Sequence, residues 1–241
     1  MAYRMFASRR LRAVAAFPML LVGVAFWGSL AAGQTTEKAV SDRVRALEAR
    51  YRGAETFRAA FLERRSEGRG SVQLESGTLL IRRPGLMRWD YESPEAKLFL
   101  VDGKHAWFYV PADRTVTKAA IRQSDDARIP LLLLTGKTTV GRVCRRIELA
   151  DVHVEGAGNT ALRCLPTKGE EEQYREALFE LDSGNRLVRL LVREAGDVET
   201  EFHFGQWEEN IPLDPSLFRF VPPKGTTIVD ERTLLGSPDG R

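Results

Sequence analysis

The first regular hydrophobic spacing in the chain predicts a helix that is followed directly by a strand. Apolar residues from Val40 to Tyr51 recur at intervals of four, three and four positions, which places them on one helical face. Charged residues fill the other positions, and Gly53 ends the pattern. Residues 56–63 then alternate with the period of a strand, with Phe57 and Phe61 on the same face.

Most of the remaining chain consists of short alternating runs separated by turn residues. The runs cover residues 77–83, 86–91, 96–101, 105–110, 144–149, 161–166, 173–181, 186–193 and 198–206, and a last run at 217–221 stops at a double proline. Asp102-Gly103 and the segment 182–185 are typical hairpin turns. Successive strands with short turns favour an antiparallel meander over a parallel sheet with helical crossovers. We therefore expect one β-rich domain of about ten strands, which is large enough to enclose more than its own side chains.

Large aromatic residues occupy alternate positions of two neighbouring strands. Trp89 and Tyr91 share one face of their strand, and Trp107 and Tyr109 share one face of theirs. Alternation alone does not decide which of these faces points inward. So many rings are covered only if the sheet curls around an apolar interior. For each ring, packing in a plain core and contact with a bound ligand both remain open.

The middle of the chain has a different pattern. Four consecutive leucines, Leu131 to Leu134, lie between Pro130 and Gly136, and polar residues precede them. Proline at the beginning and glycine at the end predict a short helix. This helix is either an ordinary part of the core or a lid over a cavity, and the sequence leaves both interpretations open.

The N-terminus has the layout of an export signal. Four arginines precede an apolar run from Ala13 to Leu30, and the small residues Ala31-Ala32-Gly33 follow. We expect residues 1–33 to be a signal peptide, residues 34–230 to form the domain and residues 231–241 to be a tail. A permanent membrane anchor is the alternative for the apolar run, which is short for a membrane span and contains Pro18. Residues 1–33 contain four Arg and no acidic residue, so their removal changes the net charge from +3 to −1. The mature chain then gives no electrostatic reason to expect a nucleic-acid partner.

Cys144 and Cys164 are the only two cysteines. In an oxidising compartment such a pair can form a disulfide, which stabilises a fold by about 3 kcal/mol. Two buried free thiols are the alternative.

The sequence contains no pattern that indicates catalysis. The three histidines are far apart and lack metal-ligand spacing, no serine lies in a nucleophile elbow, and no glycine-rich loop follows a strand and opens a helix. We therefore expect no enzyme, no catalytic residue, no metal and no cofactor.

Two motifs resemble the LolA family of periplasmic lipoprotein carriers. The first is Arg83-Pro84-Gly85-x-x-Arg88-Trp89-x-Tyr91-x-x-Pro94, and the second is Asp102-Gly103-x-x-x-Trp107-x-Tyr109. The resemblance extends to the N-terminal helix, the strands ending at Phe61 and Pro84, and the segment 218–225. It implies a mainly β fold with some α: an incomplete, unclosed antiparallel β-barrel with an N-terminal helix and short helices forming a lid over a hydrophobic cavity.

The resemblance also implies a function and its partners. Members take lipoproteins from an inner-membrane ABC transporter, carry them across the periplasm by their acyl chains and release them to an outer-membrane receptor. We expect such a carrier here, acting as a monomer. The alternatives are a paralogue that carries another lipid and a periplasmic sensor of lipid anchors.

Site residues follow in part from the resemblance. Arg83 resembles the family arginine that hydrogen-bonds the lid and steadies its closed state, while Met87 stands where members often have phenylalanine. Candidates for the cavity wall are Met87, Trp89, Tyr91, Phe99, Trp107, Tyr109, Leu131, Leu132 and Leu134.

Overall fold

The computed structural model describes residues 28–230 except 69, 122–128 and 169–173; side chains are described from residue 36, without those of 129, 130, 132, 195 and 230. The helices are α1 (Gly28–Arg52), η2 (Ile129–Thr135), α2 (Val140–Val143), η3 (Ala195–Asp197) and η4 (Pro215–Phe218). The strands are β1 (Thr56–Glu67), β2 (Val72–Arg82), β3 (Leu86–Ser93), β4 (Lys97–Val101), β5 (His105–Val110), β6 (Thr115–Ala120), β7 (Cys144–Leu149), β8 (Thr160–Pro166), β9 (Tyr174–Leu181), β10 (Leu187–Glu194), β11 (Val198–Glu209) and β12 (Thr227–Asp230).

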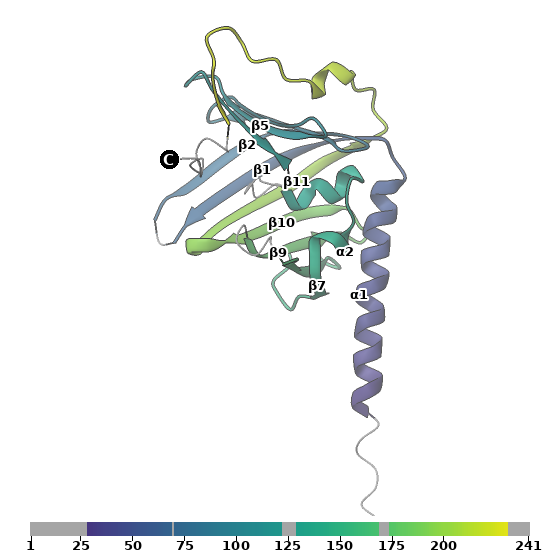
Figure 1. Cartoon of the computed structure of the whole chain (residues 1–241). Coiled ribbons are helices and arrows are strands. Elements are labelled where there is room, and N and C mark those ends of the chain that lie inside the picture. Colours follow the sequence, from purple (N-terminus) through teal and green to yellow (C-terminus); the bar gives the residue numbers. More distant parts are fainter. Residues whose placement is uncertain (1–27, 69, 122–128, 169–173, 231–241) are drawn as a thin grey trace, which may run out of the picture.

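All twelve strands belong to one curved sheet (Figure 1). Their order is β12-β6-β5-β4-β3-β2-β1-β11-β10-β9-β8-β7, and every pair is antiparallel except β12 with β6. The two ends of this order, β12 and β7, do not pair with each other, so the barrel is incomplete. This architecture confirms the predicted fold class, including the helices that accompany the sheet.

The inner, concave face of the sheet carries the core. Apolar side chains line up across neighbouring strands, as in the register Leu79–Trp89–Phe99 through β2, β3 and β4. These three side chains are buried, at 2% exposure or less. Strand alternation therefore places one row of positions from each strand on this face. Leucines of η2 belong to the same cluster of buried residues and cover part of it.

Helix α1 lies across one end of the strands (Figure 1). Its Tyr51 is buried, and the hydroxyl oxygen accepts a hydrogen bond from the backbone N–H of Leu187, at the beginning of β10 (3.0 Å). Burial, the largest influence, raises the pKa of this tyrosine. Arg50 forms an ion pair with Glu209 at the end of β11. The helix is thus fixed to the sheet by buried apolar contacts and by several polar contacts near its C-terminal end.

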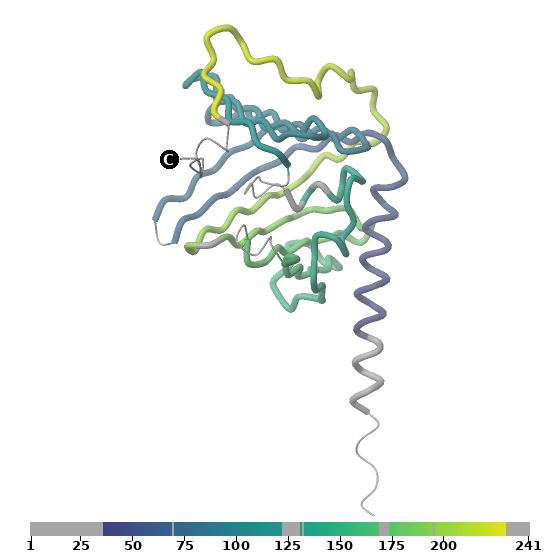
Figure 2. Tube along the Cα trace, in the orientation of Figure 1, coloured from purple at the N-terminus to yellow at the C-terminus, as the bar shows by residue number. Residues whose placement is uncertain are grey.

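The chain between β11 and β12, residues 210–226, is called the C-terminal segment. It runs over the outer, convex face of the sheet (Figure 2). Residues 217–221 do not form a strand, so that prediction is wrong: Asp214 and Pro215 instead start η4, with the Asp214 side chain accepting from the Ser216 N–H (2.8 Å). Phe218, the last residue of η4, is the buried residue of this helix. The two strands without a prediction, β6 and β12, pair at the edge that this segment reaches.

Glycine is required at one position of the sheet. Gly77 lies in register between Phe61 and Tyr91, and a Cβ atom there would lie 1.9 Å from the carbonyl oxygen of Asp90. Without a side chain at this point, the rings of Phe61 and Tyr91 meet with centroids 4.9 Å apart.

A disulfide joins Cys144, the first residue of β7, to Cys164 of β8. It links residues 20 positions apart and fastens the end of α2 to the sheet. A loop of this length stabilises the fold by about 3 kcal/mol through its effect on the unfolded chain.

Candidate functional site: the inner face of the sheet and its lid

An aromatic cluster forms the floor of the concave face. Trp89 lies at its centre, with its ring 4.7 Å from that of Phe61, 5.1 Å from that of Phe202 and 6.0 Å from that of Phe204. These rings come from β1, β3 and β11, which are distant in sequence; in the sheet β1 and β11 are neighbours, and β2 lies between β1 and β3. The predicted wall residues Met87, Trp89, Tyr91 and Phe99 all lie on this inner face and are buried.

The leucine-rich segment covers this floor. Leu131 and Leu134 of η2 are fully buried and belong to the same apolar cluster as Met87. The helix contacts β2, β3 and α1. The side chain of Leu132, another predicted wall residue, lies outside the described residues. The placement of η2 over the inner face is the one that a lid would occupy.

Trp107 and Tyr109 lie on the opposite face, which corrects their assignment to the cavity wall. In the register of β4 and β5, Phe108 stands opposite the inward Phe99, so its two neighbours point outward. Both rings contact Phe220 of the C-terminal segment, at 5.7 and 5.4 Å. The sequence could not reveal this, because alternation defines two faces without saying which is concave.

Trp107 has a structural role at the hairpin between β4 and β5. Its Nε1 donates to the carboxylate of Asp102 (2.8 Å), which also accepts from the N–H groups of Lys104 and His105. Burial opposes ionisation of Asp102, but these hydrogen bonds outweigh it and lower the pKa of the carboxyl group. The motif Asp-Gly-x-x-x-Trp therefore stabilises a turn.

Arg83 lies where the helix α1, the sheet and the lid meet. Its Nη1 donates to the carbonyl oxygen of Tyr51, in the last turn of α1. The guanidinium group also packs against Gly136, the residue after η2: a Cβ atom at Gly136 would lie 2.1 Å from Nη2. Burial, followed by the nearby charge of Arg52, lowers the pKa of this arginine. The guanidinium group thus donates its hydrogen bond to α1, while its contact with the lid is one of packing.

Three hydrogen bonds hold the chain between the end of η2 and the start of α2 against α1 and the sheet. The N–H of Gly85 donates to the carbonyl of Thr135 (3.1 Å), and Lys137 Nζ donates to the carbonyl of Gly103 (3.2 Å). The N–H of Val140 donates to the carboxylate of Glu48 in α1 (3.0 Å). At about 1 kcal/mol net each, these bonds hold the segment against α1 and the sheet with only modest free energy.

Beyond the aromatic floor, the inner face becomes polar. The side chains of Glu63, Glu75, Tyr91 and Lys97, which we call the inner polar cluster, come from four adjacent strands. The Tyr91 hydroxyl donates to Glu63, and Lys97 forms an ion pair with Glu75. Glu63 is only 7% exposed. Sequence reasoning missed this cluster, although Glu63 follows Phe57, Ala59 and Phe61 in the same inward phase.

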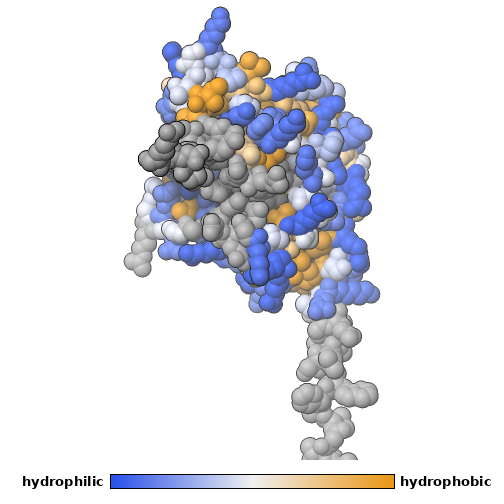
Figure 3. All heavy atoms as spheres, in the orientation of Figure 1, coloured by the Kyte–Doolittle hydropathy of each residue, from blue (hydrophilic) through white to orange (hydrophobic). Residues whose placement is uncertain are grey.

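A groove of about 1000 Å³ lies between α1, α2 and the edge strand β7. Its apolar lining comes from Val40 and Val44 of α1, Val140 of α2, and Ile147 and Leu149 of β7. Apolar side chains gather beside the upper part of α1 in Figure 3. The groove thus lies at the edge of the incomplete barrel, where β7 pairs with β8 on one side and has no second strand beside it among the described residues.

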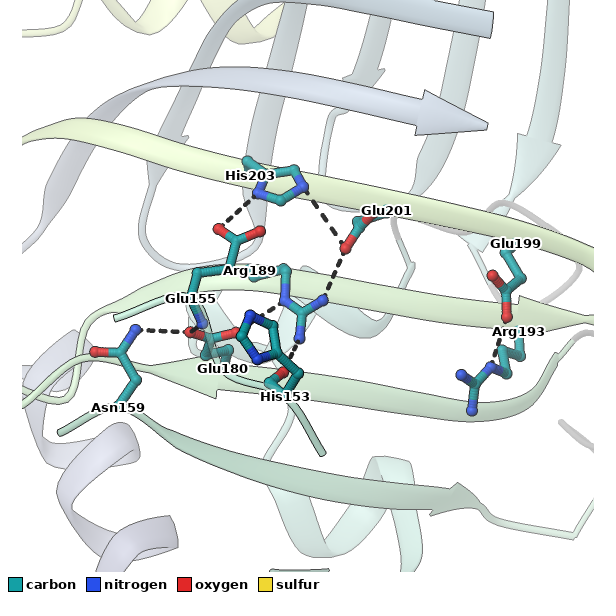
Figure 4. A network of polar contacts seen from close by, with 9 residues as sticks. All are labelled: His153, Glu155, Asn159, Glu180, Arg189, Arg193, Glu199, Glu201 and His203. Carbon is teal, nitrogen blue, oxygen red and sulfur yellow. Dashed lines mark hydrogen bonds and ion pairs between the residues drawn. The ribbon is translucent and has the colours of Figure 1, made fainter. Parts of the chain in front are cut away.

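The outer face of β9, β10 and β11 carries a charged network instead (Figure 4). Arg189 lies at its centre and binds Glu180 (2.8 Å), Glu201 (2.9 Å) and the carbonyl of His153 (3.0 Å). Burial opposes ionisation of Glu180, but hydrogen bonds from Asn159, the Glu155 N–H and Arg189 outweigh it and lower the pKa of Glu180. The network fastens the loop between β7 and β8 to the sheet.

Part of this network contains potential metal ligands. Atoms of Glu155, Glu201 and His203 lie within 4.8 Å of one another. However, the two ring nitrogens of His203 face different carboxylates, at 3.2 and 3.6 Å, and Glu201 already binds the cationic Arg189. The contacts are those of a structural ion-pair network.

The family model described as "Outer membrane lipoprotein carrier protein LolA" matches residues 52–221. An outer-membrane lipoprotein carrier protein of Nitrosomonas europaea is 29% identical over 77% of this chain and 88% of its own length. The corresponding protein of Nitrosospira multiformis is 31% identical over 77% of this chain and 87% of its own length.

A solved structure of a LolA superfamily protein from Nitrosomonas europaea is 10% identical and covers 75% of this chain and 97% of that one, with a TM-score of 0.45. Among the helices of the described residues, none combines the length and apolar character needed to cross a membrane. Because the family model covers most of the chain, the protein belongs to the LolA family of outer membrane lipoprotein carrier proteins.

Proposed function

We propose that this protein carries lipoproteins through the periplasm by sheltering their acyl chains against the inner face of the sheet. Family membership supports this function, and the observation that carries it is the buried apolar floor around Trp89 beneath η2. Burial of hydrocarbon stabilises a complex by about 0.8 kcal/mol per methylene, so two or three acyl chains provide ample affinity without precise polar contacts. The family is one of carriers, and neither catalysis nor a cofactor is part of the proposal.

The partners and location belong to the proposal as well. Cargo would come from an inner-membrane ABC transporter and pass to an outer-membrane receptor, with the carrier acting as a monomer. Export would use residues 1–33 as the signal peptide. Met87, Trp89, Tyr91, Phe99, Leu131 and Leu134 would surround the acyl chains once η2 moves away from the floor.

Arg83 would act as the latch of the lid. Its guanidinium bridges the last turn of α1 and the residue that follows η2, so the closed arrangement is stabilised by a group with fixed donors. We expect Arg83→Leu to accept cargo but to release it poorly, because the closed state that expels the cargo is weakened. Arg52→Leu is the matched control, since Arg52 is an exposed neighbour at the same helix end.

The experiment incubates the mature protein with spheroplasts and measures newly made lipoproteins in the soluble fraction. The proposal predicts soluble lipoprotein in a complex with the wild-type protein and with both variants, and transfer to outer membranes that is impaired only for Arg83→Leu. Lipoproteins that stay on the spheroplasts would contradict the carrier function. Bound lipid without polypeptide would indicate a carrier of another lipid, and a stable complex with a membrane regulator would indicate a sensor. Normal transfer by Arg83→Leu would remove the latch role alone.

A further inference from the structure

The inner face of the sheet has two chemically different parts. Tyr91 marks the boundary, because its ring packs on Phe61 with centroids 4.9 Å apart while its hydroxyl donates to Glu63. On one side lie Trp89 and the leucines of η2, and on the other lie Glu63, Glu75 and Lys97. Charged side chains do not contribute to the binding of hydrocarbon. Three of them in line with the apolar floor therefore indicate that this face also contacts polar groups.

The charged groups limit where hydrocarbon can lie. Covering a charged group with acyl chains removes its water and costs free energy unless a partner replaces that water. Glu63 is 7% exposed, and the side chains of Glu75 and Lys97 are 18% and 21% exposed. Acyl chains that followed the strands past Tyr91 would cover the remaining open surface of Glu75 and Lys97. The apolar part of a ligand is therefore best placed on the Trp89 side of the boundary.

The polar side of the boundary has the chemistry of a site for hydrogen-bonding groups. An ammonium group such as that of Lys97 donates up to three hydrogen bonds, which suits ester and amide carbonyl oxygens. The carboxylates of Glu63 and Glu75 accept hydrogen bonds, which suits amide N–H groups. A ligand that presents esters and amides next to its hydrocarbon would match both parts of the face at once.

We propose that the inner polar cluster of Glu63, Glu75, Tyr91 and Lys97 binds the ester- and amide-bearing junction of an acylated polypeptide, where the acyl chains meet the polar part of the cargo. This inference rests on the proposed carrier function and adds the orientation of the cargo to it: acyl chains point toward the lid, and the junction lies toward the β1–β2 hairpin. The cluster should also make the protein bind acylated polypeptide more tightly than simple hydrocarbon.

The test removes the Lys97–Glu75 ion pair as a unit, with Lys97→Met and Glu75→Gln in one protein. The matched control is Arg58→Met with Glu208→Gln, which removes an exposed ion pair with a contact at 2.5 Å that joins β1 to β11 on the other face of the sheet. Affinities are measured by displacement of a fluorescent acyl probe. The ligands are a dipalmitoylglyceryl-cysteine peptide, a dipalmitoyl glycerophospholipid, which has the esters but no amides, and hexadecanol, which has neither.

We expect the inner variant to bind the acylated peptide about tenfold more weakly, the effect of one or two hydrogen bonds, with hexadecanol binding unchanged. For the phospholipid we expect a loss smaller than that for the peptide, because its esters bind the cluster without the help of amides. The control variant should bind all three ligands as the wild type does. Unchanged peptide affinity, or an equal loss for peptide and hexadecanol, would overturn the inference while leaving the carrier function in place. Failure of the wild type to bind any acyl ligand would remove the carrier function itself. Thermal unfolding verifies the fold, and Glu63→Gln replaces the double variant if that protein is unfolded.

Discussion

The two faces of the sheet are stabilised by different kinds of contact. The inner face packs aromatic and aliphatic side chains against a short helix that is fastened at its end by a few hydrogen bonds. The outer face of β9 to β11 holds Arg189 among Glu180, Glu201 and a backbone carbonyl, and the described loop at 150–159 folds onto it. Apolar contacts are non-directional and exchangeable for those of a ligand, whereas a network of oriented charges has no such substitute. Contacts of the inner face can therefore be exchanged for those of a ligand, whereas the outer network holds its strands and loop in one arrangement.

The strongest way to break this arrangement is to remove the centre of the inner floor. We expect Trp89→Ala to lower the free energy of unfolding by about 3–5 kcal/mol, because the ring is fully buried and contacts Phe61, Phe202 and Phe204. Denaturant unfolding measures the loss. Trp107→Ala on the outer face is the matched control and should cost clearly less, since that ring is only half-buried. Equal losses would contradict the difference between the faces.

A smaller effect is expected from the outer network, and it should depend on pH. Because the folded protein lowers the pKa of Glu180 below its ordinary value of 4.5, the carboxylate stabilises the fold above that pH, and this stability is lost as the pH falls through the lowered pKa. We expect Glu180→Gln to cost about 2 kcal/mol at neutral pH, the size of a charge-assisted hydrogen bond, and to flatten the stability profile below pH 4.5. Unfolding curves from pH 7 to 3 measure this. Acyl ligand affinity at neutral pH should not change, and a profile as steep as that of the wild type would argue against the role of Glu180.

The smallest change in stability is expected at the lid. Gly136 has φ +70°, and a Cβ atom there would lie 2.1 Å from the guanidinium of Arg83. We expect Gly136→Ala to cost about 1 kcal/mol and to displace Arg83, so that it reproduces the slow release of Arg83→Leu. Gly141→Ala, where no atom lies within 4 Å of an added Cβ, is the control. If Gly136→Ala released cargo at the wild-type rate, the contact between Gly136 and Arg83 would have no role in release.

Much of the fold could be predicted from the sequence because local patterns determine it. Alternation and turn residues located ten of the twelve strands, and the helical spacing located the inward face of α1. The segment 217–221 shows the limit of this reasoning: its alternation is that of a strand, but the cap at Asp214 and the long-range contacts of Phe218 and Phe220 determine its conformation.

The site was less accessible to prediction than the fold. Trp89 and Trp107 have similar local patterns, and only the direction of sheet curvature decides that one is inward and the other outward. The inner polar cluster is assembled from four strands, so its members become neighbours only after the register is known. Arg83 was identified through the family motif, yet its bond to Tyr51 depends on how α1 meets the sheet.

The most direct measurement of the central claim compares the two faces in the presence of an acyl chain. Two variants of the mature protein keep a single tryptophan each, either Trp89 or Trp107, with the other and Trp207 replaced by phenylalanine. A fatty acid brominated along its chain quenches tryptophan fluorescence only on close contact. If the inner face shelters hydrocarbon, quenching is strong for Trp89 and weak for Trp107, whereas no quenching of Trp89, or equal quenching of both, would contradict the account.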